Sequence, residues 1–95
     1  MADPKTVIVT GASMGIGAAV AHAFLDRGYN VVATSRSISK AGYAPSPKLA
    51  LVDGDIGQPA TAEKVTQTAL SRFGAIDCLV NNAGIFFSKP FTDYC

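Results

Sequence analysis

The chain has 95 residues, which leaves room for one hydrophobic core and none for a second domain. A hydrophobic fraction of 48% with 16% charged residues is typical of a globular chain with many buried segments and excludes intrinsic disorder. A formal net charge of +1 gives no strong field of either sign, so we expect neither a nucleic-acid partner nor a polybasic membrane surface.

Cysteine usage and the amino terminus bear on the compartment. Cys78 lies in an apolar run and Cys95 is the last residue. Neither stands in a metal-ligand spacing, so we expect reduced thiols and no metal site. The first residues lack the basic flank and apolar region of a signal peptide, which together with free thiols favours the cytoplasm. Residues 6–25 carry no charge over about the length of a membrane span, but glycines interrupt this run and we expect no membrane segment.

The first third of the chain predicts a strand, a helix and a second strand. Lys5 to Thr10 is rich in β-branched residues and ends at a glycine, as a buried parallel strand does. A helix is expected from Gly15 to the arginine and glycine at 27–28, and Asn30 to Thr34 then forms the second strand. The residues expected on the inner face of this helix are Ile16, Ala19, Val20, Ala23 and Phe24.

The rest of the chain predicts a loop, a strand, a second helix and a last strand. Residues 35–48 are rich in serine and proline without a sustained period, which predicts a loop with at most one irregular turn and no full helix. A short strand from Leu49 to Val52 precedes a helix that starts at Pro59 and stops at Gly74, and residues 77–81 form the fourth strand. The inner face of the second helix is expected to consist of Ala62, Val65, Ala69 and Phe73.

Alternating strands and helices imply the α/β class, with right-handed crossovers and a parallel sheet covered on both faces. We expect a Rossmann-type doubly wound sheet, of which residues 1–95 form the N-terminal part in the order β-α-β-β-α-β. In such a sheet the first strand is central, the second and third lie on one side and the fourth lies on the other. A nucleotide is therefore expected over the carboxyl ends of the first and fourth strands.

The turn after the first strand reads Thr-Gly-Ala-Ser-Met-Gly-Ile-Gly, residues 10–17. The chain must reverse tightly, let a phosphate approach the backbone and start a helix close to the sheet, and Gly11, Gly15 and Gly17 meet these three demands. Amides at the start of the helix then face a pyrophosphate, with the positive end of the helix dipole behind them. A merely structural strand-to-helix turn is the alternative.

Two motifs together make the chain resemble the short-chain dehydrogenases/reductases. Residues 10–17 match the Thr-Gly-x-x-x-Gly-Ile-Gly signature of that family at every fixed position, and residues 81–84 match its Asn-Asn-Ala-Gly signature after the fourth strand. The resemblance runs from Lys5 to about Phe91. It implies an oxidoreductase that transfers a hydride between a nicotinamide cofactor and a small-molecule carbonyl or alcohol.

The resemblance also implies roles for particular residues. Asp55 matches the family's aspartate that hydrogen-bonds the adenine amino group, and Asn81 looks like a support for the central sheet. The other family positions are Gly11, Ser13, Gly15 and Ile16 on the phosphate and nicotinamide-ribose side, Ile56 beside the adenine ring, and Asn82, Ala83 and Gly84 beside the adenosine ribose.

Simpler explanations exist for several of these residues. Asp53 and Asp55 suit a turn before the second helix, and Asn81 with Asn82 can satisfy loose backbone groups at a strand end. His22 is expected to be a surface or packing residue rather than a catalytic base. The remaining aromatic residues that we expect to serve packing are Tyr29, Tyr43, Phe86 and Phe87, although the family's substrate pocket begins just after Gly84.

The end of the second strand predicts a preference for NADP(H). An NAD-specific site places a carboxylate about 20 residues beyond the glycine turn, where it would repel a 2′-phosphate. Ser35 occupies that position here and Arg36 follows it, with a guanidinium that can bind a phosphate through paired hydrogen bonds. One departure is Met14, expected to border the cofactor, where many NADP-binding relatives carry a basic residue. The alternative is that Arg36 merely points to solvent.

The residues that carry out the family's chemistry are not found in this sequence. In the family a tyrosine exchanges a proton with the substrate oxygen and a lysine four residues later lowers its pKa, but no Tyr-x-x-x-Lys occurs here. We therefore assign no catalytic residue and expect the chain alone to be inactive. A fragment of a longer enzyme, its ordered part and a truncated product stay open as explanations. The sheet is expected to expose the edge of the fourth strand, which would leave it marginally stable or dependent on a partner.

Three hypotheses about function follow. The first is an NADP(H)-dependent oxidoreductase of the cytoplasm, a homo-oligomer when complete, of which this chain is the cofactor-binding portion. The second is a non-catalytic Rossmann module for nucleotide binding or regulation. The third is a Rossmann-like transferase with another adenosine ligand, against which the pairing of the two motifs argues. A serine followed by Tyr-x-x-x-Lys downstream of Cys95 would decide for the first.

Overall fold

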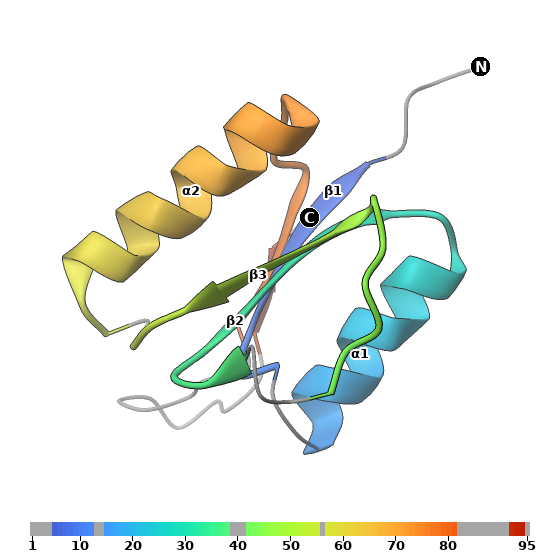
Figure 1. The fold of residues 1–95 in the computed structure, drawn as a ribbon, viewed down its shortest axis with the longest axis horizontal. Coiled ribbons are helices and arrows are strands. Elements are labelled where there is room, and N and C mark those ends of the chain that lie inside the picture. The colour runs from blue at the N-terminus through green and yellow to red at the C-terminus, as the bar shows by residue number, and fades with distance from the viewer. Residues whose placement is uncertain (1–4, 13–14, 39–41, 56, 82–91, 95) are drawn as a thin grey trace.

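The computed structural model describes residues 5–12, 15–38, 42–55, 57–81 and 92–94. Helix α1 lies on one face of a sheet and helix α2 on the other, which gives three layers (Figure 1). The elements in chain order are β1 (Thr6–Thr10), α1 (Gly15–Asp26), β2 (Asn30–Ser35), β3 (Leu49–Asp53), α2 (Pro59–Phe73), β4 (Cys78–Asn81) and β5 (Thr92–Tyr94).

The sheet has the strand order β3-β2-β1-β4-β5, with β1 to β4 mutually parallel. Strand β1 is central, β2 and β3 lie on one side of it and β4 lies on the other, so the doubly wound α/β topology predicted from the sequence is confirmed. Thr10 is in register with both Thr34 and Asn81, which brings three strand ends to one edge of the sheet. All five residues of β1 are buried, as a central parallel strand requires.

Each face of the sheet has its own hydrophobic core. On the face of α1, the side chains of Val7, Val9 and Val31 pack with Ala21 of the helix. On the other face, Ile8 and Val32 pack with Val65 and Ala69 of α2. Alternate residues of one strand thus point to opposite helices, which is why β1 reads as a continuous apolar run rather than an alternating one.

The inner faces of the two helices differ in part from the prediction. In α1, Ala21 is buried while Ala19 and Ala23 are exposed. In α2, Val65 and Ala69 are buried and Phe73 is half-buried as expected, but Ala62 is exposed. The errors fall on alanines, because a methyl side chain carries too little apolar area to mark one side of a helix as the buried side. The helix α1 also ends at Asp26, so Arg27 lies just beyond it rather than in its last turn.

The connection between β2 and β3 is irregular in its described residues. Residues 36–38 form a turn, residues 42–46 have no regular secondary structure and residues 47–48 form a second turn. The described residues thus form the predicted loop, but with two turns where the sequence predicted at most one. Ile38 is fully buried in the core on the α1 face, so this loop is packed onto the domain. The short strand β5 was not predicted, since three residues give no measurable alternation.

Strand β5 changes the expected edge of the sheet. It pairs antiparallel with β4, with Val80 opposite Asp93, so the edge of β4 that the sequence predicted to be open is covered over these residues.

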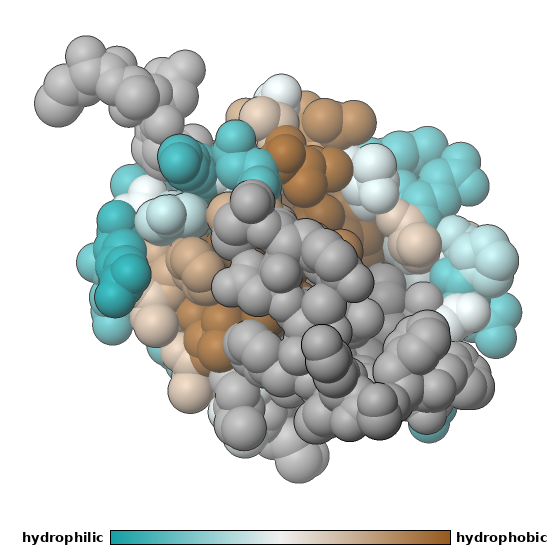
Figure 2. Space-filling model, turned by 180° about the vertical axis from the view of Figure 1, so that it is seen from behind, coloured by the Kyte–Doolittle hydropathy of each residue, from teal (hydrophilic) through white to brown (hydrophobic). Residues whose placement is uncertain are grey.

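Seen from behind, the molecule has hydrophobic surface between polar residues at the two margins (Figure 2). Among the described residues, the exposed large hydrophobic side chains are Leu51, Leu70 and Ile76. No described helix has the length and apolar character needed to cross a membrane.

Candidate cofactor-binding site

The carboxyl end of β2 is tied to the loops that follow β1 and β3. The Ala12 amide, just after β1, donates a hydrogen bond to the Thr34 carbonyl over 3.2 Å. The Gly54 amide, just after β3, donates to the Ser35 carbonyl over 2.9 Å. The buried Thr34 hydroxyl donates to the Val52 carbonyl over 2.7 Å, which fixes β2 against β3 near the same edge. This edge is therefore a rigid base for the residues predicted to bind a nucleotide.

The glycine-rich turn has the backbone that its sequence predicts. Gly11 has a φ of 62° and Gly15 a φ of 63°, in the left-handed region that side chains with a Cβ rarely adopt. Apart from its chain neighbours and the backbone of its own helix, a Cβ built on Gly15 would meet no atom of the described residues within 4 Å, so these residues leave the space in front of the first residue of α1 open. Gly17 is buried in the helix that packs on the sheet. The first turn of α1 carries no acidic residue, so the positive end of its dipole is available to an anion.

Tyr43 holds the glycine-rich turn from the side. Its hydroxyl donates a 2.6 Å hydrogen bond to the Ala12 carbonyl, and its ring stacks on His22 of α1 with centroids 4.8 Å apart. The packing role predicted for Tyr43 is confirmed. No sequence pattern predicted its hydrogen bond, because that bond depends on the path of the irregular loop. His22 is an exposed residue that packs on this ring, and Tyr29 packs edge-on against Phe24, as expected.

Burial raises the pKa of Tyr43 above its ordinary value of 10.0. A group with a raised pKa in the folded state holds its proton more tightly there than in the unfolded chain. Its stabilising contribution is therefore complete below about pH 10 and is lost as the pH rises through the raised pKa. The hydroxyl stays a hydrogen-bond donor throughout the neutral range.

We expect the difference in free energy of unfolding between wild type and Tyr43→Phe to be constant from about pH 7 to about pH 10. Above that range it should shrink, because deprotonation removes the same donor that the substitution removes. Urea unfolding of both proteins over this pH series measures the difference. A difference that grows in alkali would contradict the assignment of the buried hydroxyl.

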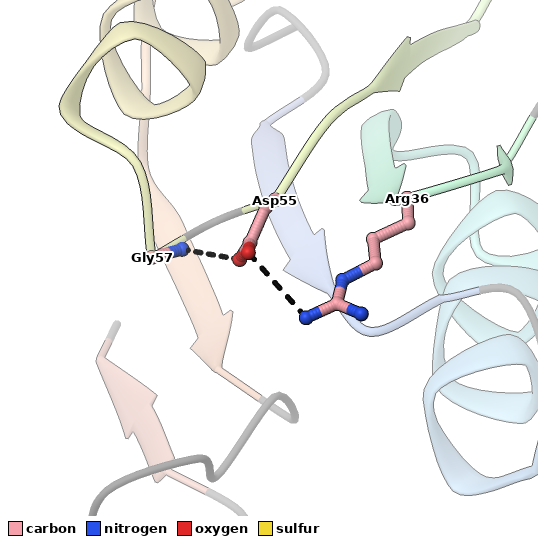
Figure 3. Close-up of polar contacts among 3 residues, drawn as sticks. All are labelled: Arg36, Asp55 and Gly57. Carbon is pink, nitrogen blue, oxygen red and sulfur yellow. Dashed lines mark hydrogen bonds and ion pairs between the residues drawn. The ribbon is translucent and has the colours of Figure 1, made fainter.

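Ser35 and Arg36 lie at the end of β2 as predicted. The Ser35 hydroxyl is buried and has no hydrogen-bond partner among the described residues, which is uncommon for a buried polar group and leaves a donor that a ligand oxygen could accept from. The Arg36 side chain is 79% exposed, and its Nη2 lies 3.4 Å from Oδ2 of Asp55 (Figure 3). Arg36 thus reaches solvent, as the alternative interpretation holds, but it also faces a second predicted site residue.

Asp55 bridges the ends of β2 and β3. Its Oδ1 accepts a hydrogen bond from the Gly57 amide over 2.9 Å, which is the local turn contact that the simpler explanation predicts (Figure 3). Its other oxygen faces Arg36. An ion pair this exposed contributes only about 0 to 1 kcal/mol, so a phosphate group can replace the carboxylate at Arg36 with little loss. The sequence predicted that Arg36 and Asp55 both lie near a bound nucleotide, but it did not predict the ion pair between them.

Several predicted site residues lie outside the described part of the chain. Ile16 and Asn81 are described in their backbone only, in α1 and β4. Among the described residues no group of three metal-binding side chains is found, and Cys78 is a buried free thiol. The site residues outside the described part are Ser13, Met14, Ile56, Asn82, Ala83 and Gly84, together with Cys95 and the Phe86 and Phe87 pair.

The geometry of the described residues fits a binding site for the phosphate groups of a dinucleotide. The open space at Gly15 lies where a pyrophosphate would approach the helix terminus. The unpartnered Ser35 hydroxyl and the exposed Arg36 guanidinium lie together at the end of the neighbouring strand. Phosphate binding sites along one sheet edge are what the parallel topology predicts at the point where the strand order reverses.

Known proteins are similar to this chain over most of its length. The family model described as short chain dehydrogenase matches residues 5–95. L-fucose dehydrogenase of Mus musculus is 42% identical over 83 residues, which cover 84% of this chain and 30% of the mouse protein. The apo form of glucose dehydrogenase of Caenorhabditis elegans is 34% identical, with a TM-score of 0.73 over 82% of this chain and 37% of that one.

The description of a third similar protein names the cofactor that it uses. YwfH, described as an NADPH dependent reductase involved in bacilysin biosynthesis, is 30% identical with a TM-score of 0.72 over 84% of this chain and 37% of that chain. The chain thus spans 30% of the mouse relative and 37% of each of these two solved structures, about a third of their length.

Proposed function

The chain belongs to the short chain dehydrogenase family, and from this premise we propose that it is the NADP(H)-binding part of an oxidoreductase. Members of the family bind nicotinamide cofactors and act on small molecules, and the named relatives are dehydrogenases or reductases. Residues 1–95 are in this proposal the N-terminal part of a single Rossmann domain. The complete protein is a cytoplasmic homo-oligomer that acts on a carbonyl or alcohol substrate.

The observation that carries the choice of NADP(H) is the pair of residues at the end of β2. Ser35 stands where an NAD-specific site has a carboxylate, and in the described part of the chain its buried hydroxyl has no hydrogen-bond partner. The Arg36 guanidinium next to it is exposed, and in the described part of the chain it makes a weak ion pair with Asp55. A 2′-phosphate would find a fork of donors here and no repelling charge at position 35. The description of YwfH as NADPH dependent supports the same choice.

The remaining predicted site residues are proposed to bind different parts of the cofactor. In the proposal Gly11, Ser13, Met14, Gly15 and Ile16 line the pyrophosphate and nicotinamide-ribose side. The adenosine side consists of Asp55 and Ile56 at the adenine and Asn82, Ala83 and Gly84 at the ribose. When bound, the nicotinamide supplies or accepts the hydride. This chain's own residues bind and orient the cofactor, and the proton-transfer residues of the reaction are assigned to none of them.

The proposal is tested by titration of the complete enzyme with NADPH and with NADH, followed by cofactor fluorescence. NADPH is expected to bind more tightly. A complete protein that binds NADPH but turns over no carbonyl or alcohol would favour the non-catalytic module instead.

The 95-residue chain made by itself is expected to reduce no carbonyl substrate above background. The reason is chemical: no Tyr-x-x-x-Lys is present to move the proton that must accompany the hydride. NADPH oxidation by the purified chain, followed by the absorbance of the reduced cofactor with a panel of aldehydes and ketones, checks this. Turnover that a substitution within residues 5–95 abolishes would contradict it.

A further inference from the structure

The irregular connection between β2 and β3 contacts the glycine-rich turn through the side chain of Tyr43. Tyr43, half-buried in this connection, donates its hydroxyl hydrogen to the Ala12 carbonyl over 2.6 Å. This distance is at the short end of the range for O–H···O hydrogen bonds, and the contact spans 31 residues of sequence. The ring behind the hydroxyl is held by the stack on His22 and by the core on the α1 face.

Ala12 is fixed by the protein through both of its backbone polar groups. Its amide donates to the Thr34 carbonyl of β2, and its carbonyl accepts from Tyr43. The residue lies between two glycines with left-handed backbone, Gly11 and Gly15, which allow the turn great conformational freedom. Because a peptide group is planar, a bond to the Ala12 carbonyl orients the whole peptide plane that follows it.

We propose that Tyr43 is a positioning residue for the phosphate-binding turn, where its hydroxyl holds the Ala12 peptide in the orientation that binds the dinucleotide pyrophosphate. This inference rests on the proposed function. A turn ordered before the cofactor arrives loses less conformational entropy on binding, so the hydrogen bond raises affinity without touching the cofactor. The pyrophosphate is common to NADPH and NADH, so the effect is the same for both cofactors.

The test compares Tyr43→Phe with wild type in the complete enzyme. Phenylalanine keeps the ring, its stack on His22 and its packing, and removes only the donor. Loss of one such bond is expected to raise the dissociation constants of NADPH and NADH alike by about three- to ten-fold, with their ratio unchanged. The KM for the cofactor should rise while kcat stays the same. In the cofactor-free enzyme, amide hydrogen exchange in peptides covering residues 11–17 should become faster.

Tyr29→Phe is the matched control, since Tyr29 is another half-buried tyrosine packed against α1, at the far end of that helix. It should change neither affinity nor exchange in the turn. A Tyr43→Phe enzyme with a lower melting temperature but unchanged dissociation constants would show a merely structural role and overturn the inference. A loss confined to NADPH would also overturn it. Wild type that binds neither dinucleotide would overturn the proposed function together with this inference.

Discussion

Gly15→Val in the complete enzyme is expected to abolish NADPH and NADH binding while the sheet stays folded. Among the described residues, a Cβ at this position meets no atom within 4 Å beyond its chain neighbours and its own helix backbone, so they leave room for the new side chain. The branched methyl groups would instead fill the space in front of the α1 terminus, where the pyrophosphate must approach the backbone. Fluorescence titration with each cofactor measures the loss, and circular dichroism monitors the fold.

Backbone strain must be separated from steric exclusion of the cofactor. Gly15 has a φ of 63°, and a left-handed backbone costs about 1 to 2 kcal/mol for a residue with a Cβ. Gly74→Val is the matched control, because Gly74 has a φ of 79°, a Cβ there also meets nothing within 4 Å, and the residue caps the far end of α2. This control should lose similar stability and keep cofactor binding. Unchanged affinity in Gly15→Val would mean that the phosphates lie elsewhere.

The topology of the fold follows from the sequence because strong local signals agree with one another. Continuous β-branched runs mark the parallel strands, and glycines or a proline mark where the helices begin or end. What the sequence leaves open is the rotation of an alanine-rich helix: in α1 it favoured Ala19 and Ala23 where the structure buries Ala21. Alanine methyl groups differ too little in burial energy for the pattern to choose between adjacent helix faces.

The candidate site was predictable to the level of backbone position and no further. Parallel strands end at one edge, so residues that follow β1, β2 and β3 had to lie near one another. The ion pair of Arg36 with Asp55 and the hydrogen bond from Tyr43 to Ala12 depend on side-chain rotamers and on the path of a loop without periodicity. Neither has a sequence spacing that would predict it, since the partners are brought together by tertiary structure alone.

Arg36→Ala in the complete enzyme is expected to weaken NADPH binding by about one to two decades and to leave NADH nearly unchanged. A hydrogen bond to a charged group contributes about 1.5 to 3 kcal/mol, and each 1.4 kcal/mol is a factor of about ten in affinity. The wild-type guanidinium gives up only an exposed contact to Asp55, 3.4 Å long, when it turns to the phosphate. Titration of both cofactors with the same protein preparation measures the two ratios.

The matched control for charge is Arg27→Ala. Arg27 is exposed just beyond the C-terminal end of α1, so its removal changes the net charge equally but away from the strand ends that carry the site. Screening confines its effect on a phosphate to a small change at ordinary ionic strength. Arg36→Lys should fall between wild type and alanine, because an ammonium keeps the charge and loses the paired donors. Two results would show that Arg36 does not bind the 2′-phosphate. One is an equal loss of affinity for NADPH and NADH in Arg36→Ala, and the other is a wild-type enzyme that prefers NADH.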